Sequence, residues 1–500
     1  MNHRDFLFVR NNHPVSLAEI PRFGPDDFRE HILQAVANGW RIAAFFGQPA
    51  AHGQILLFAV LAGDAEGQLQ IGSAEVNGQF PSLTSACPQA HLFEREIFEQ
   101  WQVRPEGHPW LKPVRFHAAW RSGDAARAPA GVTNFFSMTG EEIHEVAVGP
   151  VHAGIIEPGH FRFQCHGEQV FHLEISLGYQ HRGVERALMG GPDRRTLPYL
   201  ETLAGDTTIG HTLAYCEAVE ALARCPVPAR AQALRAIALE LERLANHTGD
   251  LGALAGDVGY LPTASYCGRI RGDFLNLTAL VCGSRFGRGW LRPGGVLFDL
   301  DEARHEQFAA RLAQLRRDVT VAVELLWNSS SVRARFENAG PLSRETALEL
   351  GLVGVAARAC GLERDARAQF PSGLYRFAQM PVSTFHTGNV FARAYVRWLE
   401  IQRSLAFLAD QLQALPQGPV RTAVAAPAPD QAVVSLVEGW RGEICHVALT
   451  NAAGKFARYK IVDPSFHNWP GLAMALRDQQ ISDFPLCNKS FNLSYCGHDL

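Results

Sequence analysis

Hydrophobic and polar positions follow two different periods in the first part of the chain. Two stretches carry apolar side chains at the 3.6-residue spacing of amphipathic helices, and three are apolar runs bounded by Gly, Asp and Pro, as strands are. The predicted helices cover 27–39 and 91–101, and the predicted strands cover 40–47, 54–63 and 69–76. This pattern predicts an α+β domain over residues 1–121, followed by a small, polar linker over 122–142.

Helical spacing dominates the second part, residues 143–500, after a short β-like region at 145–178. The clearest helix is 228–252, in which Leu and Ile side chains form one apolar stripe. Further helices are predicted at 198–224, 302–327, 343–358 and 391–414, a loop at 415–430, and a hairpin at 443–463. The sequence therefore predicts a mainly α second domain with a small β region.

The composition of the chain argues against several classes of protein. A net charge of −4 over 500 residues argues against a nucleic-acid binder, and 19% charged residues with 30 Phe leave room for interfaces with other proteins. No apolar run approaches the roughly 18 residues of a membrane helix, and the N-terminus lacks the apolar segment of a signal peptide. We therefore expect a cytoplasmic chain that reaches a membrane only through partners.

Cysteine spacing gives no metal motif. The ten cysteines are scattered, and no two form a C-x-x-C pair. Cys487, Cys496 and His498 make one loose group near the end, but a single group without a second pair is weak support for a metal site. We expect most of these cysteines to be small buried apolar residues.

Several blocks, in the same order along the chain, resemble subunits of complex I and of group 4 hydrogenases. Glu94-Arg95-Glu96 followed by the G-H-P loop at 107–109 resembles the C-type peripheral subunit of complex I. The blocks that follow resemble its D-type subunit and the large subunits of hydrogenase-4 and formate hydrogenlyase. They are GPVHAGIIEPGHFRF (149–163), the H-R-G-x-E segment (181–185), the E-L-x-R-L-x-N-H helix (240–247), RGEICH (441–446) and IVDPSFHN (461–468). The resemblance implies an α+β domain fused to a hydrogenase-large-subunit-like domain.

The resemblance also implies where a [NiFe] centre would be held. Such a centre needs four thiolates, the soft ligands that suit these metals. The four ligand positions fall on Ala204, Thr207, Ser465 and Asn468, none of which is cysteine. We therefore expect no metal and no bound cofactor in this chain, and hydrogenase activity would require other ligands for nickel.

In complex I the vacated cavity receives a quinone, and the resemblance implies candidate residues for that role. His152 and His160 match the loop histidine that approaches the quinone, although the pattern fits a loop histidine bonded to backbone equally well. Asp206 and His211 follow the first ligand segment; Asp206 can serve a proton path or simply begin a helix. In complex I a tyrosine makes the second contact with the quinone. Gly205 stands at that position here, so this chain departs from the complex I pattern of quinone contacts.

The H-R-G-x-E segment is the other candidate site. In the family its arginine lies near the terminal [4Fe–4S] cluster of a small partner subunit, so the resemblance implies that His181, Arg182 and Glu185 adjoin that cluster. The alternative is a surface Arg–Glu pair of little energetic value. Glu240, Arg243, Asn246 and His247 either carry protons or fix helix packing, and the packing interpretation is favoured. Glu157 and Asp463 are further proton-path candidates.

Two functions remain open. The first is a subunit of a complex I-like NADH-quinone oxidoreductase or hydrogenase-4-like complex, peripheral on the inner face of the cell membrane. Its partners would be a small iron–sulfur subunit and antiporter-type membrane subunits, and it would form the cavity where quinone or another acceptor is reduced. No dinucleotide-binding motif follows a strand, so any NADH binds elsewhere in the complex. The second is a redox-silent scaffold that couples partners to an ion-translocating arm.

Overall fold

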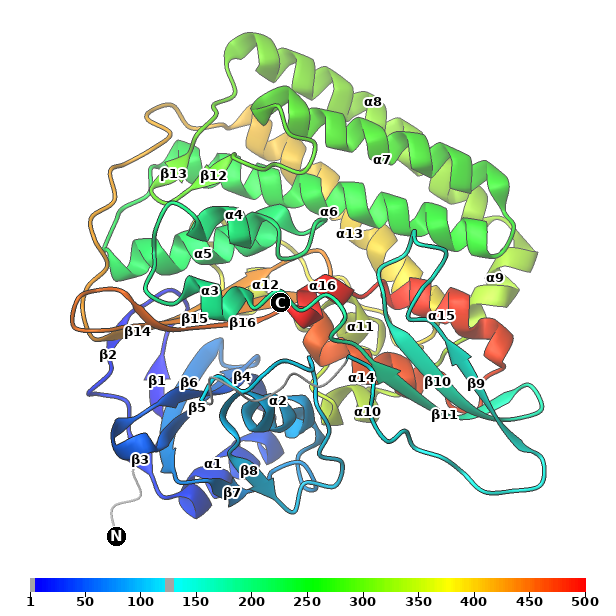
Figure 1. Ribbon diagram of the computed structural model, residues 1–500. Coiled ribbons are helices and arrows are strands. Elements are labelled where there is room, and N and C mark those ends of the chain that lie inside the picture. The colour runs from blue at the N-terminus through cyan, green and yellow to red at the C-terminus, as the bar shows by residue number, and fades with distance from the viewer. Residues whose placement is uncertain (1–4, 122–129) are drawn as a thin grey trace.

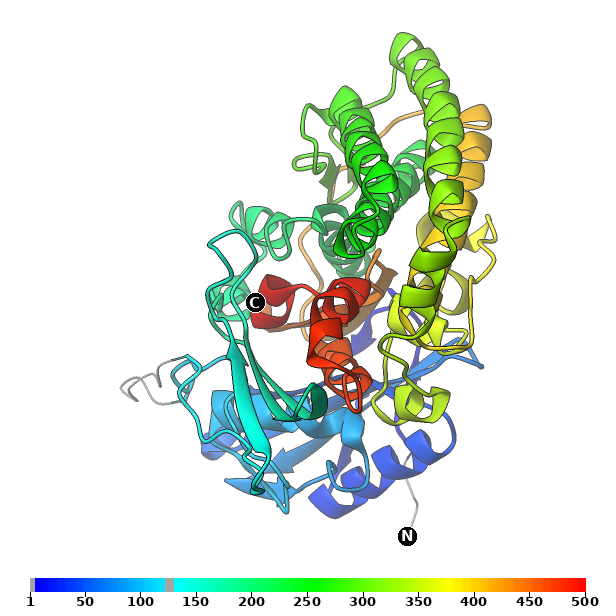
Figure 2. The same cartoon turned by 90° about the vertical axis from the view of Figure 1, so that its right-hand side faces the viewer.

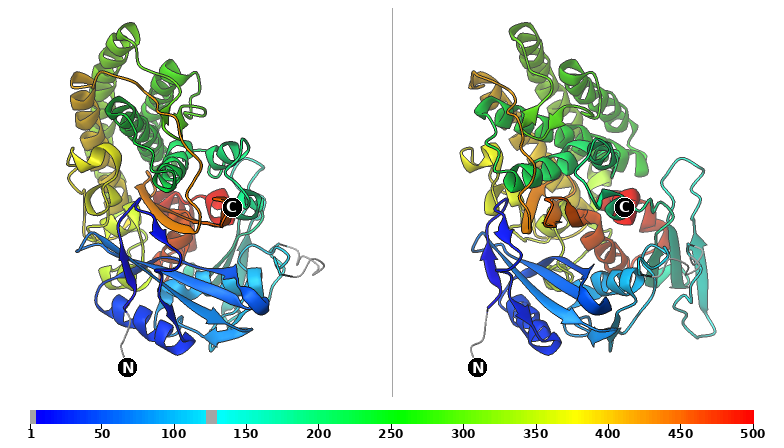
Figure 3. Two further views of the ribbon diagram at one scale, coloured as in Figure 1. Left: turned by 90° about the vertical axis from the view of Figure 1, so that its left-hand side faces the viewer. Right: turned by 60° about the vertical axis from the view of Figure 1, so that its left-hand side comes forward.

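The computed structural model describes residues 5–121 and 130–500 and arranges them in three layers (Figure 1). A sheet of the N-terminal part lies at the bottom of the view, a bundle of long helices lies at the top, and a four-stranded sheet of the C-terminal part lies between them. Figure 3 shows the same order of layers from two other sides. The expected mixture of helices and strands is confirmed, and most of the strand pairs are antiparallel.

The N-terminal part is a five-stranded sheet flanked by helices. Its strands follow the order β1–β6–β5–β4, with β3 beside β6. The elements are β1 (Leu7–Val9), β3 (Arg22–Phe23), α1 (Pro25–Ala37), β4 (Arg41–Pro49), β5 (Ile55–Gly63), β6 (Gln68–Val76), β7 (Gln79–Pro81), α2 (His91–Trp101) and β8 (Arg104–Glu106). Both predicted helices and all three predicted strands are confirmed, because clear apolar periodicity specifies them locally.

A three-stranded sheet follows along one side of the molecule, as Figure 2 shows. Its strands, in the order β11–β10–β9, are β9 (Ile143–Val148), β10 (His160–His166) and β11 (Gln169–Ser176). This confirms the predicted β-like region. The predicted linker lies partly outside the described residues, and its described part, 130–142, has no helix or strand.

Five long helices form the upper layer: α5 (Thr208–Leu222), α6 (Ala229–Asp257), α7 (Leu261–Cys282), α8 (Glu302–Trp327) and α13 (Val390–Gln413). The predicted helices at 228–252, 302–327 and 391–414 are confirmed. Helix α7 was not predicted. Its buried stripe includes Thr263 and Cys267 at helical spacing from Ile270 and Phe274. Because polar or weakly apolar residues occupy some of the buried positions, the sequence does not show a clear helical period of apolar residues.

Two predicted helices are wrong as single helices. The stretch 198–224 forms α4 (Thr196–Glu201) and α5, because Arg182 donates to the carbonyl oxygens of Thr202 and Leu203 at 2.7 and 2.8 Å and ends the first helix. The stretch 343–358 forms α10 (Arg344–Glu349) and α11 (Gly354–Ala359). Gly351, which lies between them, and Gly354, the first residue of α11, adopt φ of 66° and 64°, which breaks the helix.

The remaining elements are short: α3 (Val184–Leu188), β12 (Leu291–Arg292), β13 (Gly295–Val296), α9 (Ser330–Glu337), α12 (Ala366–Gln369), α14 (Pro464–Ala475), α15 (Phe484–Phe491) and α16 (Tyr495–Asp499). Among the described residues, no helix is both long and apolar enough to cross a bilayer.

The middle sheet is buried on both faces. It consists of β14 (Gln431–Glu438), β15 (Glu443–Thr450), β16 (Phe456–Val462) and β2 (Val15–Ser16), in the order β16–β15–β14–β2. The hairpin β15–β16 was predicted, whereas β14 and its pairing with β2 were not. Alternate residues point to opposite cores: Val433 and Val437 belong to the core beneath the helices, and Val434 and Leu436 belong to the N-terminal core.

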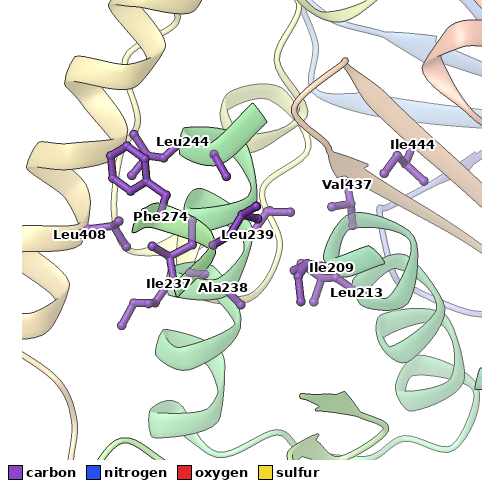
Figure 4. Close-up of a cluster of buried hydrophobic side chains, with 14 of the residues drawn as sticks. Ile209, Leu213, Ile237, Ala238, Leu239, Leu244, Phe274, Leu408, Val437 and Ile444 are labelled. Atoms are coloured by element: carbon purple, nitrogen blue, oxygen red, sulfur yellow. The ribbon is translucent and has the colours of Figure 1, made fainter. Parts of the chain in front are cut away.

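The upper core is continuous from the sheet to the outer helices. Figure 4 shows Val437 of β14 and Ile444 of β15 facing Ile209 and Leu213 of α5, while side chains of α6, α7 and α13 complete the cluster. Sharing one sheet between two cores joins the N-terminal part firmly to the rest of the chain.

Charged side chains of the middle sheet are paired across the layers. Lys460 of β16 donates to Glu96 of α2 at 2.7 Å and lies 3.1 Å from Glu185 of α3. Arg458 lies 2.8 Å from Glu185, and Arg115 pairs with Glu96. All five side chains are buried. Each carboxylate therefore has two cationic neighbours, which offsets the cost of removing the charges from water.

Replacing Lys460 by Met is expected to lower the free energy of unfolding by about 3 kcal/mol, because it removes one cation from between two buried carboxylates. Urea denaturation of the purified chain measures this. Arg269→Met is the matched control: Arg269 also pairs with two carboxylates, but it is exposed, so the loss should be under about 1 kcal/mol. Equal losses in the two variants would contradict the assigned role of the buried network.

Candidate functional site

Three segments that are far apart in sequence meet at the end of the middle sheet. Residues 204–211 at the start of α5, 440–446 at the start of β15, and Asp463 at the start of α14 are linked by side-chain hydrogen bonds. Asp463 is the N-cap of α14, and its carboxylate accepts from the backbone N–H of Ser465. The structure thus brings together Asp206, His211 and Asp463, three of the residues predicted to handle protons.

Four buried side chains form one hydrogen-bond chain, which we call the His211 relay: Asp463, His211, His446 and Tyr459. His211 Nε2 lies 3.0 Å from Asp463 Oδ2, and His211 Nδ1 lies 3.2 Å from His446 Nε2. His446 Nδ1 lies 3.0 Å from the Tyr459 hydroxyl. The relay connects the start of α14 to β15 and β16 without exposure to solvent.

Electrostatics define the resting protonation of the His211 relay. Burial opposes ionisation of Asp463, but the hydrogen bond from His211 and the charge of Arg441 outweigh it, so the pKa of Asp463 lies below its usual value. Burial and the neighbouring His211 lower the pKa of His446 well below normal, so this ring is neutral. Burial raises the pKa of Tyr459, which keeps its proton.

These protonation states fix the donor and the acceptor of each hydrogen bond in the relay. Tyr459 donates to His446 Nδ1, His446 Nε2–H donates to His211 Nδ1, and His211 Nε2–H donates to the Asp463 carboxylate. In this arrangement both ring nitrogens of each histidine are satisfied, and the four side chains form one continuous hydrogen-bonded path.

An ion pair between Arg441 and Asp206 lies beside the relay. Arg441 donates both terminal nitrogens to Asp206, at 2.6 and 2.8 Å, and its guanidinium lies over the Trp440 ring, 3.9 Å from the centroid. Burial opposes ionisation of Asp206, but Arg441 outweighs it and holds the pKa below its usual value. The Asp206 side chain is 33% exposed, whereas Arg441 is 4% exposed and the relay is buried. Asp206 is thus the accessible end of this cluster.

The two loop histidines do not contact this cluster directly. His152 Nε2 lies 2.8 Å from the Gly159 carbonyl, and His160 Nδ1 lies 3.3 Å from the Gly149 carbonyl, so both rings brace the loop between β9 and β10. The loop reaches the cluster through α16: Glu157 accepts from the backbone N–H of Cys496 at 3.3 Å.

The members of the H-R-G-x-E segment point in three directions. The His181 ring stacks on His117 with centroids 4.8 Å apart, and burial together with Arg115 lowers the pKa of His181 to about 4. Arg182 is exposed and binds the end of α4, directly before Ala204. Glu185 is buried with Arg458 and Lys460, so it serves the packing between layers rather than a surface pair with Arg182.

The four polar residues predicted on α6 fall into two groups with different contacts. Glu240, Arg243 and His247 belong to a buried ion-pair network that includes Glu400 of α13, in which His247 lies 2.9 Å and Arg243 3.4 Å from Glu400. Asn246 instead donates to the carbonyl of Asp206 at 2.9 Å. The packing interpretation therefore fits three of them, whereas Asn246 positions the candidate site.

Comparison with known proteins identifies the family. The sequence-family model of the 49 kDa subunit of respiratory-chain NADH dehydrogenase matches residues 257–431, and the family model of the 30 kDa subunit matches residues 57–129. The carbon monoxide-induced hydrogenase of Rhodospirillum rubrum is 30% identical over 350 residues, which are 70% of this chain and 97% of that protein. The chain belongs to the family of complex I 49 kDa subunits and hydrogenase large subunits.

Other relatives come from both branches of this family. Formate hydrogenlyase subunit 5 of Escherichia coli is 29% identical, covering 83% of this chain and 76% of its own length. The fused C/D component of the NADH-quinone oxidoreductase of Gluconacetobacter diazotrophicus is 26% identical, and the match covers 75% of this chain and 67% of that protein. The chain is a fused C/D-type component of a complex I-like oxidoreductase that acts with partners.

The residues at the four ligand positions do not fit a [NiFe] centre. Ala204 is packed in the core, and Thr207 accepts hydrogen bonds from Trp440 and Arg441. Ser465 accepts from the backbone of Ser494, and Asn468 exchanges two hydrogen bonds with the backbone of Val353. Carbon, hydroxyl and amide groups that are engaged within the protein cannot replace four thiolates. Residues 5–121 and 130–500 also contain no cluster of three His, Cys, Asp or Glu suited to a metal.

Sequence reasoning missed four residues of this candidate site. Arg441 and His446 lie in the RGEICH block, but nothing local shows that they face Asp206 and His211; Tyr459 lies on the neighbouring strand. Glu242 accepts from the backbone N–H groups of Ile209 and Gly210 at the start of α5, and burial raises its pKa to about 8. Inward alternation along β15 and β16 was the available signal for His446 and Tyr459.

Gly497→Ala is expected to disturb the site from the C-terminal side. A Cβ at Gly497 would lie 2.6 Å from Asp463 Oδ2, so α16 must move away from the carboxylate that anchors the His211 relay. We predict a loss of stability of about 1–3 kcal/mol, measured by urea denaturation. Gly268→Ala on α7, where the added Cβ has open space, is the control and should be neutral or slightly stabilising. Equal behaviour would contradict the close packing of α16 on Asp463.

Proposed function

We propose that this chain forms the acceptor-reducing cavity of a complex I-like, membrane-associated oxidoreductase, without a [NiFe] centre. The observation that carries the proposal is the buried His211 relay beside the accessible Asp206–Arg441 pair, at the position where hydrogenases hold their metal. We further propose that residues 1–121 are the domain of the 30 kDa type, and that residues 143–500 are the domain of the 49 kDa type with the hydrogenase-large-subunit fold.

The chemistry of quinone reduction suits this arrangement. A quinone takes up two electrons and two protons to become a quinol, and the chain must supply the protons while a partner's [4Fe–4S] cluster supplies the electrons. Arg441 stabilises negative charge that develops on the acceptor oxygen, because a fixed guanidinium in a partly dry site needs no rearrangement. The histidines and Tyr459 of the His211 relay carry protons next to Arg441, and the ionised Asp206 at the accessible edge accepts protons and passes them on. Asp206 and Asp463 raise the pKa of Arg441 despite its burial, so the guanidinium stays charged.

The surface around this cluster suits docking of partners. The loop after β9 exposes three apolar side chains, Val151 (77%), Ile155 (88%) and Ile156 (61%), and exposed Arg182 lies at the end of α4. We infer that a small iron–sulfur subunit packs over Arg182 and the loop, and that antiporter-type membrane subunits hold the hetero-oligomer on the inner face of the cell membrane. Any NADH oxidised by the complex binds to another subunit.

A redox-silent scaffold is the second candidate, and two observations favour it. The polar side chains at three ligand positions, Thr207, Ser465 and Asn468, all have hydrogen-bond partners within the chain, and Gly205 replaces the family tyrosine. A scaffold would use the same buried network only to keep its shape while it couples partners to an ion-translocating arm.

Substitution of single residues in the intact complex separates the two functions. We expect His211→Gln to lower quinone reductase turnover about 100-fold, because it interrupts proton supply. Arg182→Lys and His152→Gln, made separately, should also lower turnover if these residues adjoin the cluster and the acceptor. His305→Gln on α8, a half-buried histidine bonded to the Leu412 carbonyl, is the matched control and should leave turnover unchanged.

Turnover is measured with a water-soluble quinone, after complex assembly is checked for each variant. Normal turnover in all three site variants would reject the acceptor cavity and support the scaffold. Loss in His211→Gln with assembly intact would reject the scaffold.

A further inference from the structure

A separate cavity lies between the N-terminal part and the C-terminal part. Its volume is about 280 Å³, and it is bounded by α2, by residues 110–116, by β11 and by α14. None of the residues that line it belongs to the His211 relay or to the Asp206–Arg441 pair. Its size is just below the ~300 Å³ at which pockets for small molecules begin.

The walls of this cavity are apolar and aromatic. Leu92 of α2, Trp469 and Met474 of α14, and Trp110 are among the residues that form them. Trp469 is 3% exposed, and its indole N–H has no hydrogen-bond partner among the described residues, although a buried indole usually has one. A flat ring with a polar substituent would fill such a space and offer the missing acceptor.

The cavity has an excess of positive charge. Arg95, Lys112 and Arg477 line it, and Glu174 is the only carboxylate among the lining residues. Lys112 pairs with Glu174 at 2.6 Å. Arg95 donates to the carbonyls of Lys112 and Pro113, and no side-chain partner is found for the exposed Arg477 within the described residues. The lining residues therefore carry two more positive charges than negative ones, and Glu99, on α2 outside the lining, offsets part of the charge of Arg95.

The histidines of the cavity add donors and acceptors but no charge. Burial lowers the pKa of His91 to about 3, and it also lowers the pKa of His172 and of His498. Arg95 acts in the same direction on His91, and Arg477 on His172. The lining thus combines neutral imidazoles, aromatic walls and net positive charge.

We propose that this cavity binds a small amphipathic anion, with an aromatic body between Trp110 and Trp469 and a carboxylate or sulfonate held by Arg477 and Arg95. Charge complementarity excludes a cationic ligand, and the apolar walls disfavour inorganic phosphate. A ligand here would touch His498, whose neighbour Asp499 accepts from the backbone of Gly178 and Gln180, just before the H-R-G-x-E segment.

The probe for this site is 8-anilinonaphthalene-1-sulfonate, an aromatic sulfonate that fluoresces in apolar surroundings, titrated into the intact complex. We expect saturable binding of one molecule per copy of this chain. Arg477→Glu should weaken it about tenfold, because charge reversal repels the sulfonate. Ala473→Trp, which fills the cavity, should abolish it. Arg311→Glu, an exposed arginine on α8, is the matched control and should bind the probe as the unchanged protein does.

The uncharged analogue N-phenyl-1-naphthylamine tests the role of charge. It should bind more weakly than the sulfonate and should not respond to Arg477→Glu. Equal sulfonate binding in Arg477→Glu and Arg311→Glu, or no saturable binding at all, would overturn the proposal. Because Arg477 is exposed, its variant keeps the test valid even if Ala473→Trp fails to fold.

Discussion

A sheet buried on both faces is the constraint on which this structure depends. The strands β14–β16 separate two apolar cores, so a charged side chain on them cannot reach water and must find a partner in the layer above or below. Lys460 and Arg458 meet carboxylates of α2 and α3, and Glu443 meets Arg41 at 2.5 and 2.7 Å. The same contacts that neutralise these charges hold the N-terminal part against the rest of the chain.

The candidate site is a consequence of the same constraint. His446 and Tyr459 project from the sheet toward α5, where His211 continues the hydrogen-bond chain to Asp463. The sequence resemblance implies that the four thiolates of a [NiFe] centre would lie in this region. Here hydroxyl, amide and methyl groups occupy the ligand positions, and the buried polar groups satisfy one another. What remains at the accessible edge is the Asp206–Arg441 pair, whose carboxylate is 33% exposed.

Local sequence pattern predicted most of the longer elements, because helices such as α6 and strands such as β5 carry a clear apolar period. It failed where distant contacts decide the structure. The break between α4 and α5 depends on Arg182 from another segment, and β2, near the N-terminus, forms only by pairing with β14 in the C-terminal part. For the site, motif resemblance indicated Asp206 and His211, but only folding reveals that Arg441, His446 and Tyr459 face them. Glu185 shows the opposite case: the resemblance implied a place beside a partner's cluster, with a surface Arg–Glu pair as the alternative, and folding buries Glu185 against Arg458 and Lys460.

The most direct test of the proposed acceptor cavity is the location of a bound acceptor in the intact complex. A photoreactive quinone analogue can be cross-linked to the complex and the labelled peptides identified by mass spectrometry. The proposal predicts label within residues 204–211 or 440–446, next to Asp206 and Arg441, with protection by excess unlabelled quinone. Protectable label found only on other segments or on other subunits would contradict it.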